Sequence, residues 1–325
     1  MAEKRYVRAI NEALCEEMER DPAVCLLGVD VGAPGGPFGA TRGLLERFGP
    51  QRVRDTPISE AAVVGLAIGA ATLGLRPVVE IMFMDFLALV MDQLVNQAAK
   101  MRYMTGGQAK LPLVVRTQTG YRDSAGPQHA QSLEAWLAHV PGLKVVMPSS
   151  PYEAKGLLKA AIRDDNPVIV VENRTLYALA EEVPDEDYVL PLEQAAIKRE
   201  GQDVTIASVG VMVREALAAA ATLAERGIFC EVIDLRSVNP LDLQTVRASL
   251  AKTNRLVIAH SAARFGGIGA ELAAALGEDA FYMLDAPITR VGAAFAPIPF
   301  SPPLEQAVVP DRTAIIAAVE RVLAP

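Results

Sequence analysis

Short apolar runs in the first half of the chain constrain its fold more than any other feature. They lie at residues 24–31 (VCLLGVDV), 78–83 (VVEIMF), 113–118 (LVVRTQ), 143–147 (LKVVM) and 168–172 (VIVVE). Helical patterns separate them, at residues 41–48, 85–104 and 152–163. Near-continuous apolar strands joined by helices are typical of a parallel sheet that is covered on both faces. The sequence therefore predicts an α/β fold with a doubly wound sheet.

A second and shorter series of the same kind follows. Its strand-like runs lie at residues 204–209, 230–235, 255–259 and 282–285, and its helical patterns at 214–226, 241–250, 269–276 and 313–323. Between the two series, residues 178–202 are acidic, contain proline and have weak periodicity, which is typical of a linker. We expect two doubly wound domains, at residues 1–185 and 203–325, joined by a linker at 186–202.

The composition excludes several classes of function. The 325 residues are 51% hydrophobic and carry a net charge of -8, so the chain can bury a large core but has no basic surface for nucleic acid. Its three cysteines (Cys15, Cys25, Cys230) and three histidines do not suggest a disulfide framework or a multi-histidine metal site. The apolar stretch at 61–75 is shorter than the roughly 20 residues of a membrane span. With no signal-peptide pattern at the N-terminus, a cytoplasmic protein is expected.

One acid, Glu60, stands at the start of an otherwise small and apolar segment, residues 56–71 (TPISEAAVVGLAIGAA). On an exposed helix, Ser59 would be the N-cap and Glu60 a first-turn acid favoured by the helix dipole. This helix is apolar all round, which indicates burial, and a buried acid usually has a ligand or a catalytic task. Gly65 and Gly69 would let another helix approach closely, so packing between subunits is an equal alternative.

The second candidate is His129, in the segment at 126–151 (GPQHAQSLEAWLAHVPGLKVVMPSSP). A single histidine is more often structural than catalytic. His129, however, follows a loop rich in hydrogen-bonding groups after a predicted strand, and ligands of open α/β sheets bind at the carboxyl ends of the strands. His139, one helix later, is expected to be a packed histidine.

The remaining motifs are weak. The aromatic and methionine residues at 80–86 (EIMFMDF) are expected in the core, and the glycine-rich segment at 264–271 lacks the GxGxxG spacing of a dinucleotide site. The sequence contains no GxxxxGK[ST], GxSxG or HExxH motif. From the residues alone, one acid and one loop histidine in a two-domain α/β chain indicate an enzyme without identifying its reaction.

Five stretches together carry a resemblance to a known family. They are GGPFGATRGLLERFG, DTPISEAAVVGLAIGAA, MDQLVNQAAKMRYMTGG, GPQHAQSLEAWLAHVPGLKVVMPSSPYEAKGLLKAAIRDDNPV and CEVIDLRSVNPLD. In this order they resemble the beta subunit of the thiamin-diphosphate-dependent first component of 2-oxo acid dehydrogenase complexes, a group that includes pyruvate, branched-chain and acetoin dehydrogenases. The resemblance covers essentially the whole chain. It implies an N-terminal thiamin-diphosphate pyrimidine-binding domain and a transketolase-type C-terminal domain.

The resemblance also implies roles for particular residues. Glu60 matches the acid that hydrogen-bonds N1′ of the cofactor's aminopyrimidine and promotes its activation. Ile58 resembles a residue that contacts the pyrimidine, Met82 occupies a cofactor-binding position, and Phe86 matches the aromatic residue that packs on the ring. His129 is similar to the family histidine that stabilises intermediates and assists transfer of the acyl group to lipoamide.

A potassium site is implied as well. The run at 161–167 resembles a structural loop that binds K⁺ mostly through main-chain oxygens, and hard oxygen ligands suit such a cation. A capped turn would have the same sequence pattern. The residues that match the loop and its facing strand are Ala161, Asp164, Asn166, Leu111, Leu113 and Val114.

Partners follow from what the sequence lacks. Related sites hold Mg²⁺ and diphosphate through a GDG…N motif, which this chain does not contain. In the family a separate alpha subunit carries that half, so the resemblance implies an α2β2 heterotetramer with a shared site. It also implies that the C-terminal domain docks the peripheral subunit-binding domain of a dihydrolipoyl acyltransferase core.

Three departures from the family pattern leave alternatives open. Relatives read GED where this chain has Val29 after Gly28, many oxo-acid enzymes have Gln at the position of Met82, and relatives often have HEA where Ser261 follows His260. The leading expectation is oxidative decarboxylation of a 2-oxo acid, of pyruvate or branched-chain type, with the acyl group passed to lipoamide. Cleavage of acetoin or another α-hydroxy ketone or diketone is the enzymatic alternative. A non-catalytic scaffold subunit is the other.

Overall fold

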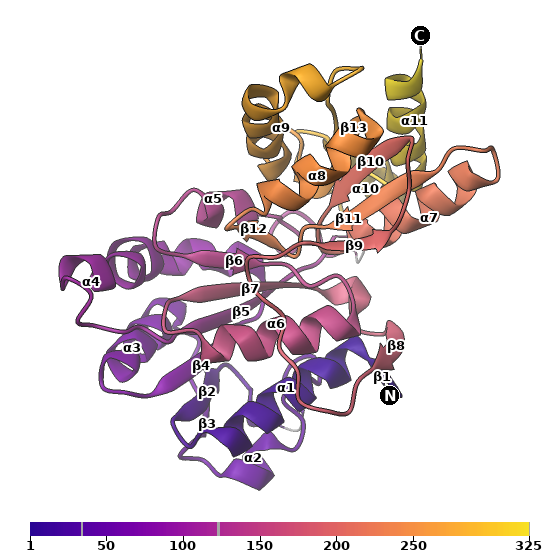
Figure 1. Ribbon diagram of the computed structural model, residues 1–325. Helices are drawn as coiled ribbons and strands as arrows, with labels where there is room; N and C mark the ends of the chain where they lie inside the picture. The colour runs from indigo at the N-terminus through magenta and orange to yellow at the C-terminus, as the bar shows by residue number, and fades with distance from the viewer. Residues whose placement is uncertain (34, 122–123, 325) are drawn as a thin grey trace. The chain divides into compact units, whose positions relative to one another are not determined.

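A computed structural model describes residues 1–33, 35–121 and 124–324 of the chain (Figure 1). The chain forms two compact units, one from Met1–Gly120 and Trp136–Leu192, the other from Tyr121–Ala135 and Glu193–Pro325. Each unit contains a largely parallel sheet flanked by helices, so the predicted α/β fold is confirmed. No helix in the described residues is long and apolar enough to cross a membrane.

The sheet of the first unit has the strand order β6-β7-β5-β4-β2-β3, with parallel neighbours throughout. All but one of these strands coincide with the predicted apolar runs, the exception being β3, for which no strand was predicted. The strands at the centre are buried along nearly their whole length because helices cover the sheet. Their bounds are β2 (Val24–Gly28), β3 (Val53–Asp55), β4 (Arg76–Ile81), β5 (Val114–Thr119), β6 (Lys144–Val146) and β7 (Val168–Asn173).

Helices of the first unit connect these strands. They are α1 (Tyr6–Arg20), α2 (Leu44–Phe48), α3 (Glu60–Thr72), α4 (Ala99–Met104) and α6 (Pro151–Arg163), with a short 3-10 helix η3 (Arg174–Leu176). Strands β1 (Ala2–Arg5) and β8 (Ala180–Val183) form a separate antiparallel pair. A further short helix, α5 (Glu134–Ala138), spans the boundary between the two units.

The prediction of one continuous helix at 85–104 is wrong. The chain makes a 3-10 helix η1 (Met84–Val90), a π-helix η2 (Asp92–Ala98) and only then α4. Segments of 3-10 and π-helix change the direction of side chains along a helix and often occur at functional sites. Here η1 begins directly after β4, at the same end of the sheet as the start of α3.

The second unit has the strand order β14-β13-β10-β11-β9, in which only β9 runs antiparallel to its neighbour. The strands are β9 (Ala196–Arg199), β10 (Val204–Ser208), β11 (Cys230–Asp234), β13 (Leu256–Ala263) and β14 (Thr289–Ala293), with β12 at Ser237–Asn239. The helices are α7 (Met212–Ala224), α8 (Leu243–Thr253), α9 (Ile268–Asp279), η4 (Phe281–Met283), α10 (Pro302–Val308) and α11 (Arg312–Leu323).

Two predictions about these segments are corrected. The strand expected at 282–285 is absent, since η4 occupies that position and β14 begins only at Thr289. Within the predicted linker, residues 196–199 form the edge strand β9. The earlier part of the linker is held against α6, because the Tyr188 ring stacks on Tyr152 at 4.9 Å and Leu190 N donates to the Gly156 carbonyl at 3.2 Å.

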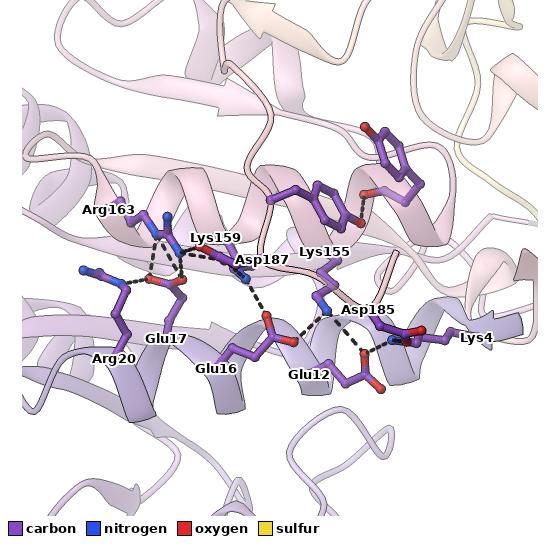
Figure 2. Close-up of polar contacts among 12 residues, drawn as sticks. Lys4, Glu12, Glu16, Glu17, Arg20, Lys155, Lys159, Arg163, Asp185 and Asp187 are labelled. Carbon is purple, nitrogen blue, oxygen red and sulfur yellow. Dashed lines mark hydrogen bonds and ion pairs between the residues drawn. The ribbon is translucent and has the colours of Figure 1, made fainter. Parts of the chain in front are cut away.

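Helices α1 and α6 are joined by a row of ion pairs (Figure 2). Lys155 lies 2.6 Å from Glu16, and the buried Lys159 bonds both Glu16 and Asp187. Glu17 is completely buried and accepts hydrogen bonds from Arg163 at 2.6 Å and Arg20 at 2.7 Å. The acids come from α1 and the segment after β8, and most of the bases come from α6, so the row fastens three parts of the first unit together.

Replacing Glu17 by Gln should destabilise the fold, because it leaves two guanidinium groups without their shared carboxylate. Removing one partner of a buried pair costs about 3–5 kcal/mol. We expect about 2–3 kcal/mol here, since the Arg20 side chain is 43% exposed. Urea denaturation would measure the loss, and Glu19→Gln on the exposed side of the same helix is the control. Equal stability of the two variants would contradict a structural role for the row.

Candidate active site

A pocket of about 340 Å³ opens in the first unit at the carboxyl ends of β2 and β4. This is the edge of a parallel sheet where ligands of α/β proteins bind. The pocket is largely apolar with a few polar groups, as is usual for a small-molecule site. The strand ends and the residues that follow them contribute Gly28, Val29, Thr56, Ile58, Glu80, Ile81 and Met82, and the following helices contribute Glu60, Val63, Phe86 and Leu89.

All four residues expected to bind a cofactor line this one pocket. Ile58 is 80% exposed at its rim, whereas Glu60, Met82 and Phe86 are half-buried. Ile58 and Glu60 come from the start of α3, and the other two follow β4. Residues 22 or more positions apart therefore meet because β2 pairs with both β3 and β4. Their individual roles stay predictions.

The ring of Phe86 is held by a chain of aromatic contacts. Phe83 lies edge-on to it with ring centroids 5.9 Å apart, and Phe38 lies edge-on to Phe83 at 5.7 Å. The guanidinium of Arg174 sits 4.6 Å from the centre of the Phe38 ring. Edge-to-face aromatic pairs and cation–π contacts of this kind restrict ring orientation. Phe86 is thus presented to the pocket in a fixed position.

The environment of α3 differs from the expectation of a helix buried on all sides. Val63, Val64, Ala67 and Ile68 are buried, but the opposite face is exposed. That face comprises Ala62, Gly65, Leu66, Gly69 and Leu73. The prediction that α3 is buried on all sides is wrong for this chain alone, because no described part of the chain covers this face. Ser59, the expected N-cap, makes no side-chain hydrogen bond to the start of the helix.

Glu80, for which the sequence predicted no role, lines the pocket and belongs to a buried ion cluster behind it. Arg116 donates to Glu80 Oε2 at 2.9 Å and to both oxygens of Glu172 at 2.8 and 3.1 Å. Tyr177 donates its hydroxyl to Glu172 Oε2. Burial raises the pKa of Glu80, with Glu172 adding to the effect and Arg116 opposing it. No local spacing in the sequence signals this cluster, because its members lie on separate strands.

Thr56 is a second pocket residue that the sequence reasoning did not single out. Its hydroxyl oxygen is buried and has no hydrogen-bond partner within the described part of the chain. Buried polar groups are nearly always hydrogen-bonded, so an unsatisfied hydroxyl beside a pocket indicates a ligand that supplies the missing bond. In the sequence, the only sign that Thr56 contacts a ligand is its position just before Ser59 and Glu60, where the helix begins.

His129 lies in the second unit, in the segment Tyr121–Ala135 that follows β5. It is half-buried, and its segment is fastened to that unit by several contacts. Tyr121 donates to the sulfur of Met212 at 3.6 Å, and Ser132 and Ser261 oxygens lie 3.4 Å apart. His139, expected to be packed, is exposed. That expectation failed because the side chain falls on the outer face at the end of α5.

The expected potassium residues lie together where α6 ends and β5 begins. Leu111 N donates to the Asp165 carbonyl at 2.9 Å, and the side chains of Leu111, Leu113, Val114 and Ala161 are buried, which leaves only their main-chain oxygens as ligands. Four side-chain cations already bind the loop at 161–167, among them Arg102, which donates to the Asn166 side chain at 2.6 Å, and Lys110, which pairs with Asp165 at 2.8 Å. Arg76 donates to the carbonyls of Ile162 at 2.8 Å and Asp164 at 2.7 Å, and Lys144 pairs with the Asp164 carboxylate at 2.7 Å.

Comparison with known proteins gives the family. The model for the transketolase pyrimidine binding domain matches residues 2–179, and the model for the transketolase C-terminal domain matches residues 193–315. The chain therefore belongs to the transketolase-like family, as the resemblance in its sequence predicted. A solved structure titled "Split gene transketolase, inactive beta4 tetramer" shares the fold, with a TM-score of 0.80 at 24% identity over 98% of this chain and 97% of that one.

Relatives at full length place it more narrowly among beta subunits. The chain is 46% identical to the beta subunit of acetoin:2,6-dichlorophenolindophenol oxidoreductase from Cupriavidus necator, over 99% of this chain and 98% of that protein. It is 47% identical to the equivalent subunit from Bacillus subtilis, over 97% and 96%. It is also 47% identical to the beta subunit of the pyruvate dehydrogenase E1 component from Rickettsia felis, over 97% and 96%.

Glu134, five residues after His129, provides a test of the electrostatics of this segment. Both carboxyl oxygens are buried without a partner in the described residues, and burial raises the pKa to about 7. An acid whose pKa is raised in the folded state contributes least to the stability of the fold when it is ionised. Stability associated with Glu134 is therefore highest below pH 4.5 and declines until the pH passes about 7.

Glu134→Gln should remove this pH dependence. A pKa difference of one corresponds to about 1.4 kcal/mol, so the variant should gain about 3 kcal/mol over the wild type between pH 4.5 and pH 8. Denaturation at several pH values would measure the difference, with Glu225→Gln as an exposed control. A constant difference between Glu134→Gln and wild type across this range would show that Glu134 does not titrate as expected.

Proposed function

We propose that this chain is the beta subunit of a heteromeric, thiamin-diphosphate-dependent dehydrogenase that acts on a 2-oxo acid of pyruvate or branched-chain type and passes the acyl group to lipoamide. The observation that supports it most is the pocket in which Glu60 and Phe86 meet, inside the region that matches a pyrimidine binding domain. The names of the full-length relatives support the same class of reaction.

The pocket residues fit the pyrimidine half of thiamin diphosphate. Glu60 is an acid at the pocket, Phe86 offers a fixed ring for stacking, and the unpartnered Thr56 hydroxyl offers a further polar contact. Gly28 lets Val31 and Glu80 approach closely beside the pocket, since an added Cβ would lie 2.8 Å from Val31 and 3.0 Å from the Glu80 carbonyl. When bound, the cofactor supplies an electron sink for decarboxylation.

The chain's own residues then have separate tasks in the proposal. Glu60 holds and exchanges a proton at N1′ of the ring, which is general acid–base work for a carboxyl shielded from bulk water. Ile58, Met82 and Phe86 hold the ring and exclude water. His129 stabilises intermediates and assists transfer of the acyl group, as it does in the family that the sequence resembles.

An alpha subunit would complete the site. The sequence has no GDG…N motif, so Mg²⁺ and the diphosphate would be held mainly by that partner. The exposed apolar face of α3 supports a partner at this position. A Cβ added at Gly69 would meet nothing within 4 Å, and one at Gly65 would only touch Gln93 at 4.0 Å, so neither glycine is needed for packing within this chain. We propose an α2β2 heterotetramer in the cytoplasm.

Two further binding functions belong to the proposal. The loop of Ala161, Asp164 and Asn166 would bind structural K⁺ through main-chain oxygens, because each carbonyl keeps a second lone pair beyond the bonds already described. The C-terminal domain at residues 203–325 would dock the peripheral subunit-binding domain of a dihydrolipoyl acyltransferase core. Both rest on the family resemblance.

Acetoin or a related α-hydroxy ketone or diketone is the second candidate substrate. Met82 favours it, because this residue lines the pocket where many oxo-acid enzymes have Gln, and two of the relatives are named for acetoin. A non-catalytic scaffold is less well supported, since Glu60 and His129 are retained. A dye-reduction screen of 2-oxo acids and acetoin, with the chain co-expressed with its cognate alpha subunit, separates the three outcomes.

Glu60→Gln should leave the assembly intact but lower turnover by about 10²–10⁴-fold, the usual contribution of general acid–base catalysis, because an amide cannot exchange the N1′ proton. His129→Ala should spare exchange of the thiazolium C2 proton and slow acyl transfer. Proton exchange followed by NMR and acyl transfer to a lipoyl domain measure the two steps. If Glu60→Gln stays within a few-fold of wild type in proton exchange, Glu60 is only a structural cap.

A further inference from the structure

The ion cluster of Glu80, Arg116, Glu172 and Tyr177 is the most deeply buried group of charges in contact with the pocket. Glu80 and Arg116 are direct partners in the parallel pairing of β4 with β5, and Glu172 lies on the neighbouring strand β7. The side chains of Arg116, Glu80 and Glu172 are 1%, 3% and 1% exposed. Only Glu80 of these four also lines the pocket.

The charges of this cluster do not balance. Two carboxylates share one guanidinium and Tyr177 is a neutral hydroxyl donor, so the cluster carries one excess negative charge when both acids are ionised. Glu172 is the better compensated acid, because both of its oxygens accept from Arg116 and one also accepts from Tyr177. The excess charge therefore resides on Glu80, at the wall of the pocket.

An uncompensated charge at a dry site is costly unless a cation approaches it. Glu60 adds a second acid to the same pocket, while the described lining contains no lysine or arginine. The pocket is therefore electrostatically complementary to a positively charged ring. An aminopyrimidine that holds a proton at N1′ is such a ring.

We propose that Glu80 is the second acidic residue of the ring pocket, and that its negative charge, held in place by Arg116, stabilises the protonated aminopyrimidine beside Glu60. Glu80 is a positioning residue: it acts on the ring through its negative charge and exchanges no proton with N1′ itself. This inference rests on the proposed function, since it names the charge state of the cofactor ring that the pocket prefers.

The proposal makes binding dependent on pH in a defined direction. Without ligand, burial raises the pKa of Glu80, an effect that Arg116 opposes and Glu172 reinforces. A cationic ring favours the ionised form, so Glu80 loses its proton on binding while a neutral ring gains one at N1′, and no net proton is released. Affinity should be constant with pH while Glu80 is protonated in the free protein and should fall once Glu80 is ionised there, because binding then takes up a proton.

Isothermal titration calorimetry of thiamin diphosphate with the complex of this chain and its alpha subunit tests this directly. Titrations in two buffers of different ionisation enthalpy give the number of protons exchanged. We expect affinity about tenfold weaker in Glu80→Gln than in the wild type, as for a pKa change of about one, because the cationic ring loses its counter-charge. Equal affinity in the two proteins would overturn the proposal.

Glu172→Gln is the matched variant, because it neutralises the other carboxylate of the same cluster. Arg116 is then available to Glu80 alone, so Glu80 is ionised before the ligand arrives. We expect this variant to keep its affinity and to take up about one more proton per site than the wild type, which also decides the matter if Glu80→Gln does not assemble. Equal proton exchange in Glu172→Gln and the wild type would contradict the charge count. Absence of any binding by the wild-type complex would contradict the proposed function instead.

Discussion

The parallel pairing of β2 with β3 and β4 determines where the candidate site lies. Parallel strands end at a common edge, so Gly28, Thr56 and Glu80 are brought to one place although they are far apart in the sequence. The start of α3 then adds Glu60 to the same edge. Loss of this pairing would separate every group that lines the pocket.

The same region has the features of an incomplete site. The exposed face of α3 is apolar, its glycines are not used for packing in this chain, and the Thr56 hydroxyl has no partner among the described residues. Soluble proteins seldom leave such a surface uncovered unless it binds something. A shared site on an alpha–beta interface accounts for these features together, and it agrees with the lack of a diphosphate-binding motif in the sequence.

The sequence predicted what depends on local pattern and failed where distant residues decide. The central strands were predicted because each is a short apolar run, and Glu60 stood out as a single acid before an apolar helix. Helix η2 was not predicted, because π-helical hydrogen bonding has no clear sequence signal. The Glu80–Arg116 pair, 36 residues apart, was hidden because strand register alone brings the two side chains together. Exposure of the α3 face likewise depends on what the rest of the chain covers.

The central claim is that this chain supplies only half of a cofactor site. Calorimetric titration of thiamin diphosphate with Mg²⁺ into the isolated chain, and into the same chain assembled with its alpha subunit, tests it most directly. The account predicts saturable binding by the complex and much weaker binding by the isolated chain, since the pocket described here receives only the pyrimidine. Micromolar binding by the isolated chain, equal to that of the complex, would contradict a shared site.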